Sequence, residues 1–350
     1  MQEIEMHNTN GITFLAVAEV GGKTYFSAWY HNGIFQLHKD GTVEFIMLFD
    51  RYGDESPRHE FAFVIKDTIV FVSSLPEYEI VLFSPGDKKI EYLKYPVSEK
   101  TCVYRPFWGY VNRNNTTYLL PNCYDAVLAF NLDNRTFSRY VLPVERDAFC
   151  EEASVIVGGT AVDEAVYFCP WNCSEIISFN LLTLEFKILG KVPKNVFRHM
   201  LYIDKKIILI PRMLGASILV YDIEENTLAE KEMPPMIQGI CICVFVDEKG
   251  NMYFFPHGQG KVWIWNLASE TLDMINLKTN NEVKIEQLYF NEARDLWGGK
   301  IIFTDYETLS HLLFDGKEIK LFDINKKQGL FLDILMNMVD NHIGMAVYEY

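Results

Sequence analysis

A sequence unit that repeats every 42–49 residues restricts what this chain can fold into more than any other feature. Four copies resemble one another closely, and they begin at Thr116, Ala165, Lys206 and Asn251. Three looser copies begin at Lys23, Thr68 and Lys300. In six of the copies, a polar residue follows an aromatic residue and serves as a register mark, at Ser84, Asn131, Asn180, Asp222, Asn266 and Asp315.

Repeats in the forties that are built from β-type segments are typical of β-propellers, in which each repeat is one four-stranded blade. Runs such as "TIVFV", "KIILI" and "NMYFF" are apolar throughout, as expected of strands buried on both faces. A buried helix is the competing interpretation, but the flanking Pro and Gly and the β-branched residues favour strands. The sequence therefore predicts an all-β fold, a seven-bladed β-propeller of four-stranded blades near residues 12–49, 60–96, 103–143, 151–193, 197–234, 238–278 and 285–324.

Turn residues recur at fixed places within the repeat. Proline lacks the N–H that a strand ladder needs, so we expect four prolines to end second strands; these are Pro121, Pro170, Pro211 and Pro256. Segments such as "LDNRT", "EENT" and "ASET" are expected to form the turns between third and fourth strands. "EVGGK" and "DEKGN" are expected to connect first and second strands.

The repeats occupy residues 1–324, which we expect to form one propeller domain. The remaining tail, 325–350, differs from them: "QGLFLDILMNMVDNH" has apolar residues at helical spacing and "IGMAVYEY" is typical of a strand. A short C-terminal helix and strand packed on the propeller are therefore predicted. The strand could pair with the first blade, or it could begin an incomplete eighth blade.

Over residues 12–324 the chain resembles the kelch-type and WD-type β-propeller superfamily. The resemblance is one of architecture. The place of the kelch double glycine holds Pro-Asn, Pro-Trp, Pro-Arg and Pro-His, and no WD dipeptide ends a third strand. The resemblance implies a ring of blades with broad loop faces, and it assigns no role to any residue.

Composition excludes several classes of partner. The formal net charge is −15, and an acidic surface repels phosphate backbones, so nucleic acid is not expected as a partner. No run of 18 apolar residues suggests a membrane span, and the polar start "MQEIEMHNTN" does not suggest a signal peptide. We expect a cytoplasmic protein in which the seven cysteines are reduced. The Cys169/Cys173 and Cys241/Cys243 pairs favour structural thiols over a zinc site, so neither metal nor cofactor is expected.

The candidate site is a rim of arginine, histidine and tryptophan. In a propeller, the second-to-third loops and the connections between blades open on one face, and half of the ten arginines fall there. Arginine recognises carboxylate or phosphate with two parallel hydrogen bonds, and aromatic rings suit planar groups or sugar faces. The predicted ligand-binding residues are Arg58, His59, Arg105, Trp171, Arg198, His199, Arg212 and His257. The alternative is that these residues pair with acidic residues of the same rim, such as Glu60 and Glu151.

Two classes of function remain open. The first is a binding or scaffold propeller that presents a loop face to a protein or small-ligand partner. The alternative is an enzyme or binder that acts on a small anionic ligand, such as an acidic saccharide, in the central funnel. The sequence has neither H-E-x-x-H nor G-x-S-x-G, which favours the first class and leaves catalytic residues unknown.

Overall fold

The computed structural model describes residues 14–28, 32–38, 43–49, 59–73, 78–97, 106–122, 124–143, 159–162, 164–169, 175–192, 197–211, 213–214, 217–237, 239–246, 249–256, 261–276, 290–296, 300–305, 310–314 and 319–322. Within these ranges the secondary structure consists of strands β1 to β29, and no α-helix is present. A search of the same residues finds no helix long and apolar enough to cross a membrane.

The described strands form seven antiparallel sheets, numbered here in chain order. Sheet 1 contains β1 (Phe14–Val20), β2 (Lys23–Ala28), β3 (Ile34–Leu37) and β4 (Val43–Met47). Sheet 2 contains β5 (His59–Ile65), β6 (Thr68–Ser73), β7 (Glu79–Ser84) and β8 (Lys89–Lys94). Sheet 3 contains β9 (Phe107–Arg113), β10 (Thr116–Pro121), β11 (Ala126–Asn131) and β12 (Thr136–Val141). Sheet 4 contains β13 (Gly159–Val162), β14 (Ala165–Phe168), β15 (Glu175–Asn180) and β16 (Phe186–Lys191).

The later sheets repeat this order with one addition. Sheet 5 contains β17 (Phe197–Ile203), β18 (Lys206–Pro211), β20 (Ser217–Asp222) and β21 (Thr227–Glu232). Sheet 6 contains β22 (Gly239–Val246), β23 (Asn251–Pro256), β24 (Lys261–Asn266) and β25 (Thr271–Asn276), and β22 also pairs with β19 (Met213–Leu214). Sheet 7 contains β26 (Phe290–Leu296), β27 (Lys300–Asp305), β28 (Ser310–Phe314) and β29 (Ile319–Phe322). Strand β19 was not predicted, because two residues are too few to show the alternation of apolar and polar residues that marks a strand.

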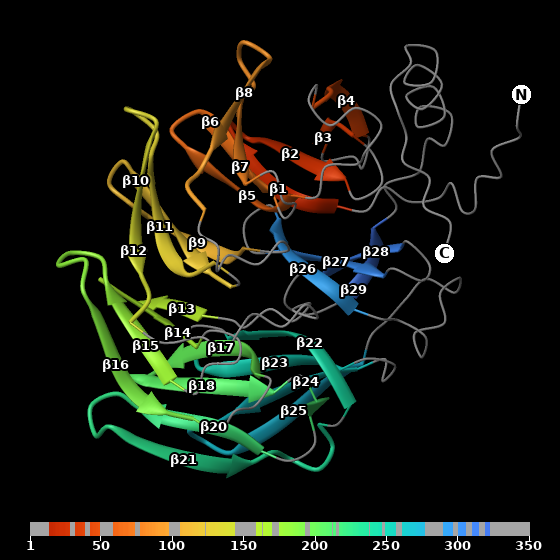
Figure 1. The fold of residues 1–350 in the computed structure, drawn as a ribbon. Coiled ribbons are helices and arrows are strands. Elements are labelled where there is room, and N and C mark those ends of the chain that lie inside the picture. Colours follow the sequence, from red (N-terminus) through yellow and green to blue (C-terminus); the bar gives the residue numbers. More distant parts are fainter. Residues whose placement is uncertain are drawn as a thin grey trace, which may run out of the picture.

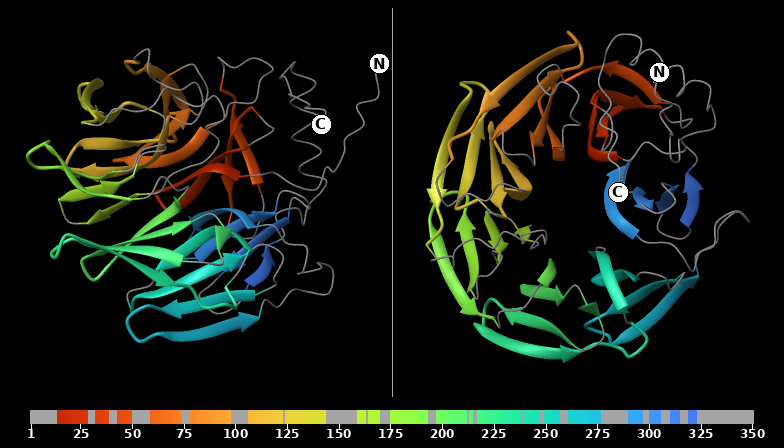
Figure 2. Two further views of the ribbon diagram at one scale, coloured as in Figure 1. Left: turned by 60° about the horizontal axis from the view of Figure 1, so that its bottom comes forward. Right: turned by 45° about the vertical axis from the view of Figure 1, so that its right-hand side comes forward.

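The sheets follow one another around a ring, and sheet 7 lies beside sheet 1 (Figures 1 and 2). Neighbouring sheets approach most closely through their first strands, as β1 does with β5, β13 with β17, and β22 with β26. The first strands therefore lie nearest the axis, and the fourth strands lie at the outside. The predicted all-β propeller fold is confirmed. The count of seven closed blades and the division between 1–324 and a tail over 325–350 stay predictions, because the tail lies outside the described residues.

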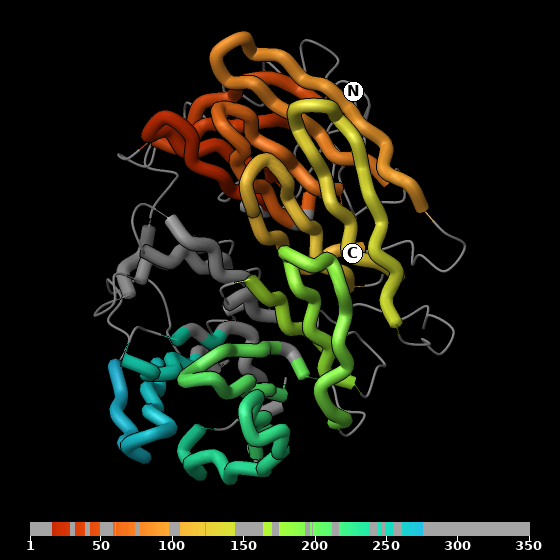
Figure 3. The backbone as a smooth tube through the Cα atoms, turned by 90° about the vertical axis from the view of Figure 1, so that its left-hand side faces the viewer, coloured from red at the N-terminus to blue at the C-terminus, as the bar shows by residue number. Residues whose placement is uncertain are grey.

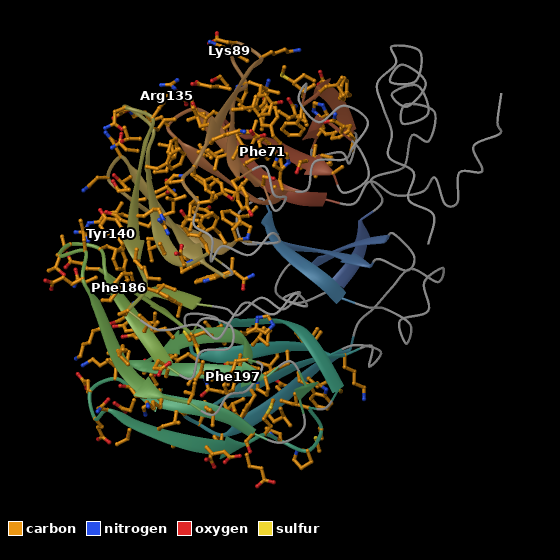
Figure 4. The ribbon with its side chains drawn as sticks, in the orientation of Figure 1. Phe71, Lys89, Arg135, Tyr140, Phe186 and Phe197 are labelled. Atoms are coloured by element: carbon orange, nitrogen blue, oxygen red, sulfur yellow. The ribbon has the colours of Figure 1, made fainter. Side chains whose placement is uncertain are left out.

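The hydrophobic core is divided among the interfaces between neighbouring sheets. Figure 3 shows the backbones of sheets 2, 3 and 4 following one another along the ring. Phe71 of β6 has no exposed surface and lies between sheets 1 and 2 (Figure 4). Strands β6 and β10 are buried over five of their six residues, whereas the fourth strand β12 has no buried residue. The apolar runs without polar alternation are therefore buried strands, as predicted.

The register marks are explained by hydrogen bonds within the turn between the third and fourth strands. The Oδ1 atom of Asn131 accepts hydrogen bonds from the backbone N–H groups of Asp133 at 3.0 Å and Asn134 at 3.2 Å. The same pair of bonds forms at three further marks, Asn180, Asp222 and Asn266. A short side chain with an oxygen acceptor at this place satisfies two turn amides, which is the physical reason that the residue recurs.

The residue four positions after five of the six marks adopts a positive φ. It is Lys88 (50°), Arg135 (54°), Leu184 (61°), Asn226 (54°) or Glu270 (56°). The turn from the first to the second strand of sheet 1 contains Gly21 and Gly22, and both have a positive φ. A two-residue hairpin of type I′ requires a positive φ at both central residues. Pro121, Pro211 and Pro256 end their second strands as predicted, and Pro170 lies outside the described residues.

Candidate functional site

The first strands share an irregularity at the end where they begin. Each of these first strands pairs with the second strand of its sheet. Between the first two residue pairs that join the two strands, the first strand contains one residue more than the second strand. The extra residues are Glu60 in β5, Trp108 in β9, Arg198 in β17, Ile242 in β22 and Asn291 in β26. A comparable shift occurs in β1 between Phe14 and Val17. Such β-bulges bend the strand and redirect a side chain, and they are frequent beside functional sites.

The bulges define one end of the propeller, which we call the bulged end. There the first strands begin and the second strands finish, as the pairs Phe107–Pro121 and Phe197–Pro211 show. The opposite end carries the turns from first to second and from third to fourth strands, and we call it the turn end. Both ends are fixed by the antiparallel order of each sheet.

All eight predicted ligand-binding residues are at or next to strand ends of the bulged end in the chain. Arg58 directly precedes β5, and Arg105 lies two residues before β9. Trp171 lies three residues after β14, and Arg212 and His257 directly follow β18 and β23. These five residues lie outside the described residues. Arg198 is the bulged residue of β17, and the structure describes its backbone but not its side chain. The convergence of these side chains on one volume therefore stays a prediction.

His59 is one of the two predicted residues with a described side chain. Its imidazole has no exposed surface and packs 4.5 Å from the ring of Phe49 and 5.3 Å from the ring of Phe71. Burial lowers the pKa of His59 from 6.5 to about 3, because the charged imidazolium loses its hydration. The ring is neutral at pH 7 and brings no positive charge to the rim. The other such residue, His199 of β17, is partly exposed.

An exposed aromatic surface on the innermost strands was not predicted. Tyr110 of β9 is 39% exposed, and its ring stacks on Phe63 of β5 at 4.6 Å and on Phe61 at 5.7 Å. The two strands belong to neighbouring sheets and lie next to the axis. Partial burial of the Tyr110 hydroxyl raises its pKa, so the hydroxyl stays protonated and can donate a hydrogen bond. The first strands differ in sequence from copy to copy, so the repeat gave no sign of this surface.

The described residues contain no group of three or more His, Cys, Asp or Glu side chains placed to hold a metal ion. Cys169 is a buried free thiol in the core between sheets 4 and 5. Cys173 and the side chains of Cys241 and Cys243 lie outside the described residues. The absence of zinc and of disulfides in the whole chain stays a prediction.

Neither a protein-family model nor a curated protein matches this sequence. Solved structures do resemble it. Virginiamycin B lyase from Staphylococcus aureus, in selenomethionine form, matches with a TM-score of 0.59 and 12% identity, over 85% of this chain and 92% of that one. YCF48 bound to D1 peptide matches with a TM-score of 0.57 and 11% identity, over 84% and 89%. The chain has a β-propeller fold.

A third propeller structure is a catalytically inactive virginiamycin B lyase from Staphylococcus aureus with quinupristin. It matches with a TM-score of 0.53 and 13% identity, over 75% of this chain and 83% of that one. At such identities the likeness concerns the fold alone, and it transfers no catalytic residue to this propeller.

Proposed function

We propose that this β-propeller is a binding or scaffold module that presents its bulged end to a protein or small-ligand partner. The recurring bulge is the observation that carries the proposal. Six of the seven sheets have one extra residue at the same place on the innermost strand. A ladder defect that recurs on the innermost strands at one end of the ring favours that end as the working face.

The exposed ring of Tyr110, which stacks on the buried rings of Phe61 and Phe63, supports the same proposal. Tyrosine provides a large contact area and a polar group at small entropic cost, and it is enriched in protein interfaces. Tyr110 is rigidly supported from one side by two stacked rings and leaves over a third of its surface exposed. A partner that reaches the central wall could pack against it. Two proteins of the same fold have partners: YCF48 is bound to D1 peptide, and the lyase structure contains quinupristin.

The finer parts of the proposal follow from sequence. We retain the kelch-type or WD-type character of the repeats, a cytoplasmic location, and a partner that is neither nucleic acid nor membrane. The net charge of −15 supports the exclusion of nucleic acid, because it would repel the phosphate backbone. An enzymatic activity would belong to the alternative function, in which the propeller acts on a small anionic ligand.

Site-specific photo-crosslinking tests the scaffold proposal. A benzophenone amino acid would replace Arg198 at the bulged end or Lys205 in the turn at the opposite end of the same strand, β17. We expect one discrete adduct from position 198, competed by unlabelled protein and reduced by Tyr110→Ala. Equal labelling from both positions, or labelling from position 205 alone, would contradict the proposal.

The alternative is a small anionic ligand, such as an acidic saccharide, bound in the central funnel. It is favoured by the position of Arg198 at a bulge and by the chain positions of Arg58, Arg105 and Arg212 beside the same end. Each charge-assisted hydrogen bond to a desolvated anion contributes about 1.5–3 kcal/mol, so one lost arginine should weaken binding about tenfold or more.

Titration with glucuronate, galacturonate and sialic acid tests this alternative. Arg198→Ala and Arg212→Ala should each weaken binding, whereas Arg135→Ala should not, because Arg135 lies at the turn end and pairs with Glu91 at 2.9 Å. If the two rim variants bind as the parent protein does, or if none of the three acids binds, the rim is structural and only the scaffold proposal remains.

A further inference from the structure

A cavity of about 470 Å³ lies at the turn end, where sheet 1 meets the turn between β7 and β8 of sheet 2. Its wall comes from β2, β3 and β4 and from that turn. Its volume falls in the range of small-molecule sites. It is on the opposite end of the propeller from the bulges, so it is independent of the proposed binding face.

Two lysines line this cavity, Lys23 and Lys88. Among the described residues neither of them forms an ion pair, although three other lysines at turn-end hairpins do, in the pairs Lys66–Asp133, Lys205–Glu224 and Lys206–Asp222. The chain as a whole carries a charge of −15. Two ammonium groups without acidic partners therefore make a locally positive place on an acidic protein, which attracts an anion.

The cavity also has an ordered polar wall. Gln36, which is 7% exposed, places its Nε2 atom 3.3 Å from Nδ1 of His38. The Nε2 atom of His38 is in turn 3.3 Å from Oε2 of Glu44. If the amide donates to Nδ1, Nε2 carries the proton and donates to the carboxylate, so both contacts orient the imidazole.

Tyr25 adds a hydroxyl group to the same wall. Burial and, to a smaller degree, the Glu44 carboxylate raise the pKa of Tyr25, so this hydroxyl stays protonated. The cavity thus presents an amide, an imidazole, a carboxylate and a hydroxyl. Ile46 and Pro85 supply apolar surface beside them.

These features restrict the occupant. The lysines suit a phosphate or carboxylate group, whereas Glu44 would repel a second negative charge and instead suits a hydroxyl donor. The apolar residues suit the C–H face of a small ring or chain. We propose that this cavity is a binding site for a small polyhydroxylated anion, with its anionic group near Lys23 and Lys88 and its hydroxyls bonded to Gln36, His38 and Glu44.

Calorimetric titration of the full chain with glucose 6-phosphate, gluconate, inorganic phosphate and glucose tests the proposal. We expect at least one of the first two to bind ten times more tightly than phosphate or glucose, since only they combine charge and hydroxyls. The comparison between them tells a phosphate from a carboxylate. If neither binds more tightly than about 10 mM, or if inorganic phosphate binds as well as both, the proposal fails.

Two lysine variants locate the site. Lys88 has a φ of 50°, which glycine adopts without strain, so Lys88→Gly removes the charge and leaves the turn intact. It should weaken the binding of glucose 6-phosphate or gluconate about tenfold. Lys89→Ala is the matched control, because Lys89 is the next residue, does not line the cavity and has no ion pair with a described residue. Figure 4 shows Lys89 on the hairpin of β7 and β8. Equal losses in both variants would overturn the assignment.

A third variant has the opposite sign. Glu44→Gln removes the repulsive carboxylate, so it should tighten the binding of inorganic phosphate while it weakens the preference for glucose 6-phosphate over phosphate. Thermal unfolding of each variant verifies that it is folded. Should Glu44→Gln not fold, the comparison of Lys88→Gly with Lys89→Ala still decides the matter.

Discussion

Acidification is expected to destabilise this propeller through His59. The imidazole is buried between Phe49 and Phe71, and its pKa is about 3 in the folded protein against 6.5 as the ordinary value. Because the folded pKa is lowered, the unfolded chain binds the proton first. The stability contributed by the neutral ring is complete above pH 6.5 and is lost as the pH falls from 6.5 towards 3.

The magnitude follows from the two pKa values. One pH unit corresponds to about 1.36 kcal/mol, so at pH 5.0, about 1.5 units below the ordinary pKa, the loss is about 2 kcal/mol. His59→Phe keeps a ring at this place and removes the titration. The free energy of unfolding should therefore fall by about 2 kcal/mol less in the variant than in the parent protein between pH 7.5 and 5.0.

Urea unfolding followed by tryptophan fluorescence at pH 7.5, 6.0 and 5.0 measures this difference. If His59→Phe and the parent protein lose the same free energy of unfolding on acidification, the reasoning about His59 is refuted.

Three further predictions concern stability and are measured by urea unfolding. Asn131→Ala should lower the free energy of unfolding by about 1 kcal/mol, because two turn amides lose their acceptor, and Asn131→Asp should restore most of it; equal losses in both would contradict the role of the acceptor. Gly33→Ala should cost about 1–3 kcal/mol, since its Cβ would lie 2.8 Å from the Phe45 ring, whereas Gly86→Ala, with no atom within 4 Å, should be nearly neutral. Phe71→Ala should cost about 3–5 kcal/mol, and a loss below about 1 kcal/mol would show that the interface between sheets 1 and 2 is not close-packed.

The features that the sequence predicted well have local causes. Asn131 and its equivalents recur because each turn between third and fourth strands needs the same acceptor at the same place. Prolines such as Pro121 end second strands because they cannot continue the ladder. Such local requirements leave chemically similar residues at the same place in most copies, so the repeat period and the strand order could be predicted.

The features that the sequence did not predict depend on how strands pair and pack. A bulge such as that at Trp108 is a property of two paired strands, and the first strands "FWGYVNR" and "FRHMLYI" share only their initial Phe. His59 follows Arg58 in the chain, but its side chain enters the core between sheets 1 and 2. The turn-end cavity combines Glu44 with Lys88, which belong to different repeats. None of these relations is visible within a single copy of the repeat.

A crystal structure of the full chain is the most direct test of the central claim, that each repeat is one blade and that the first strands carry a bulge at one common end. The account predicts seven four-stranded sheets around one axis, each with its first strand innermost, and one unpaired extra residue near the beginning of the first strand in every sheet except sheet 4. Six or eight closed blades, or first strands that pair without interruption at the end of Glu60, Trp108 and Arg198, would contradict it.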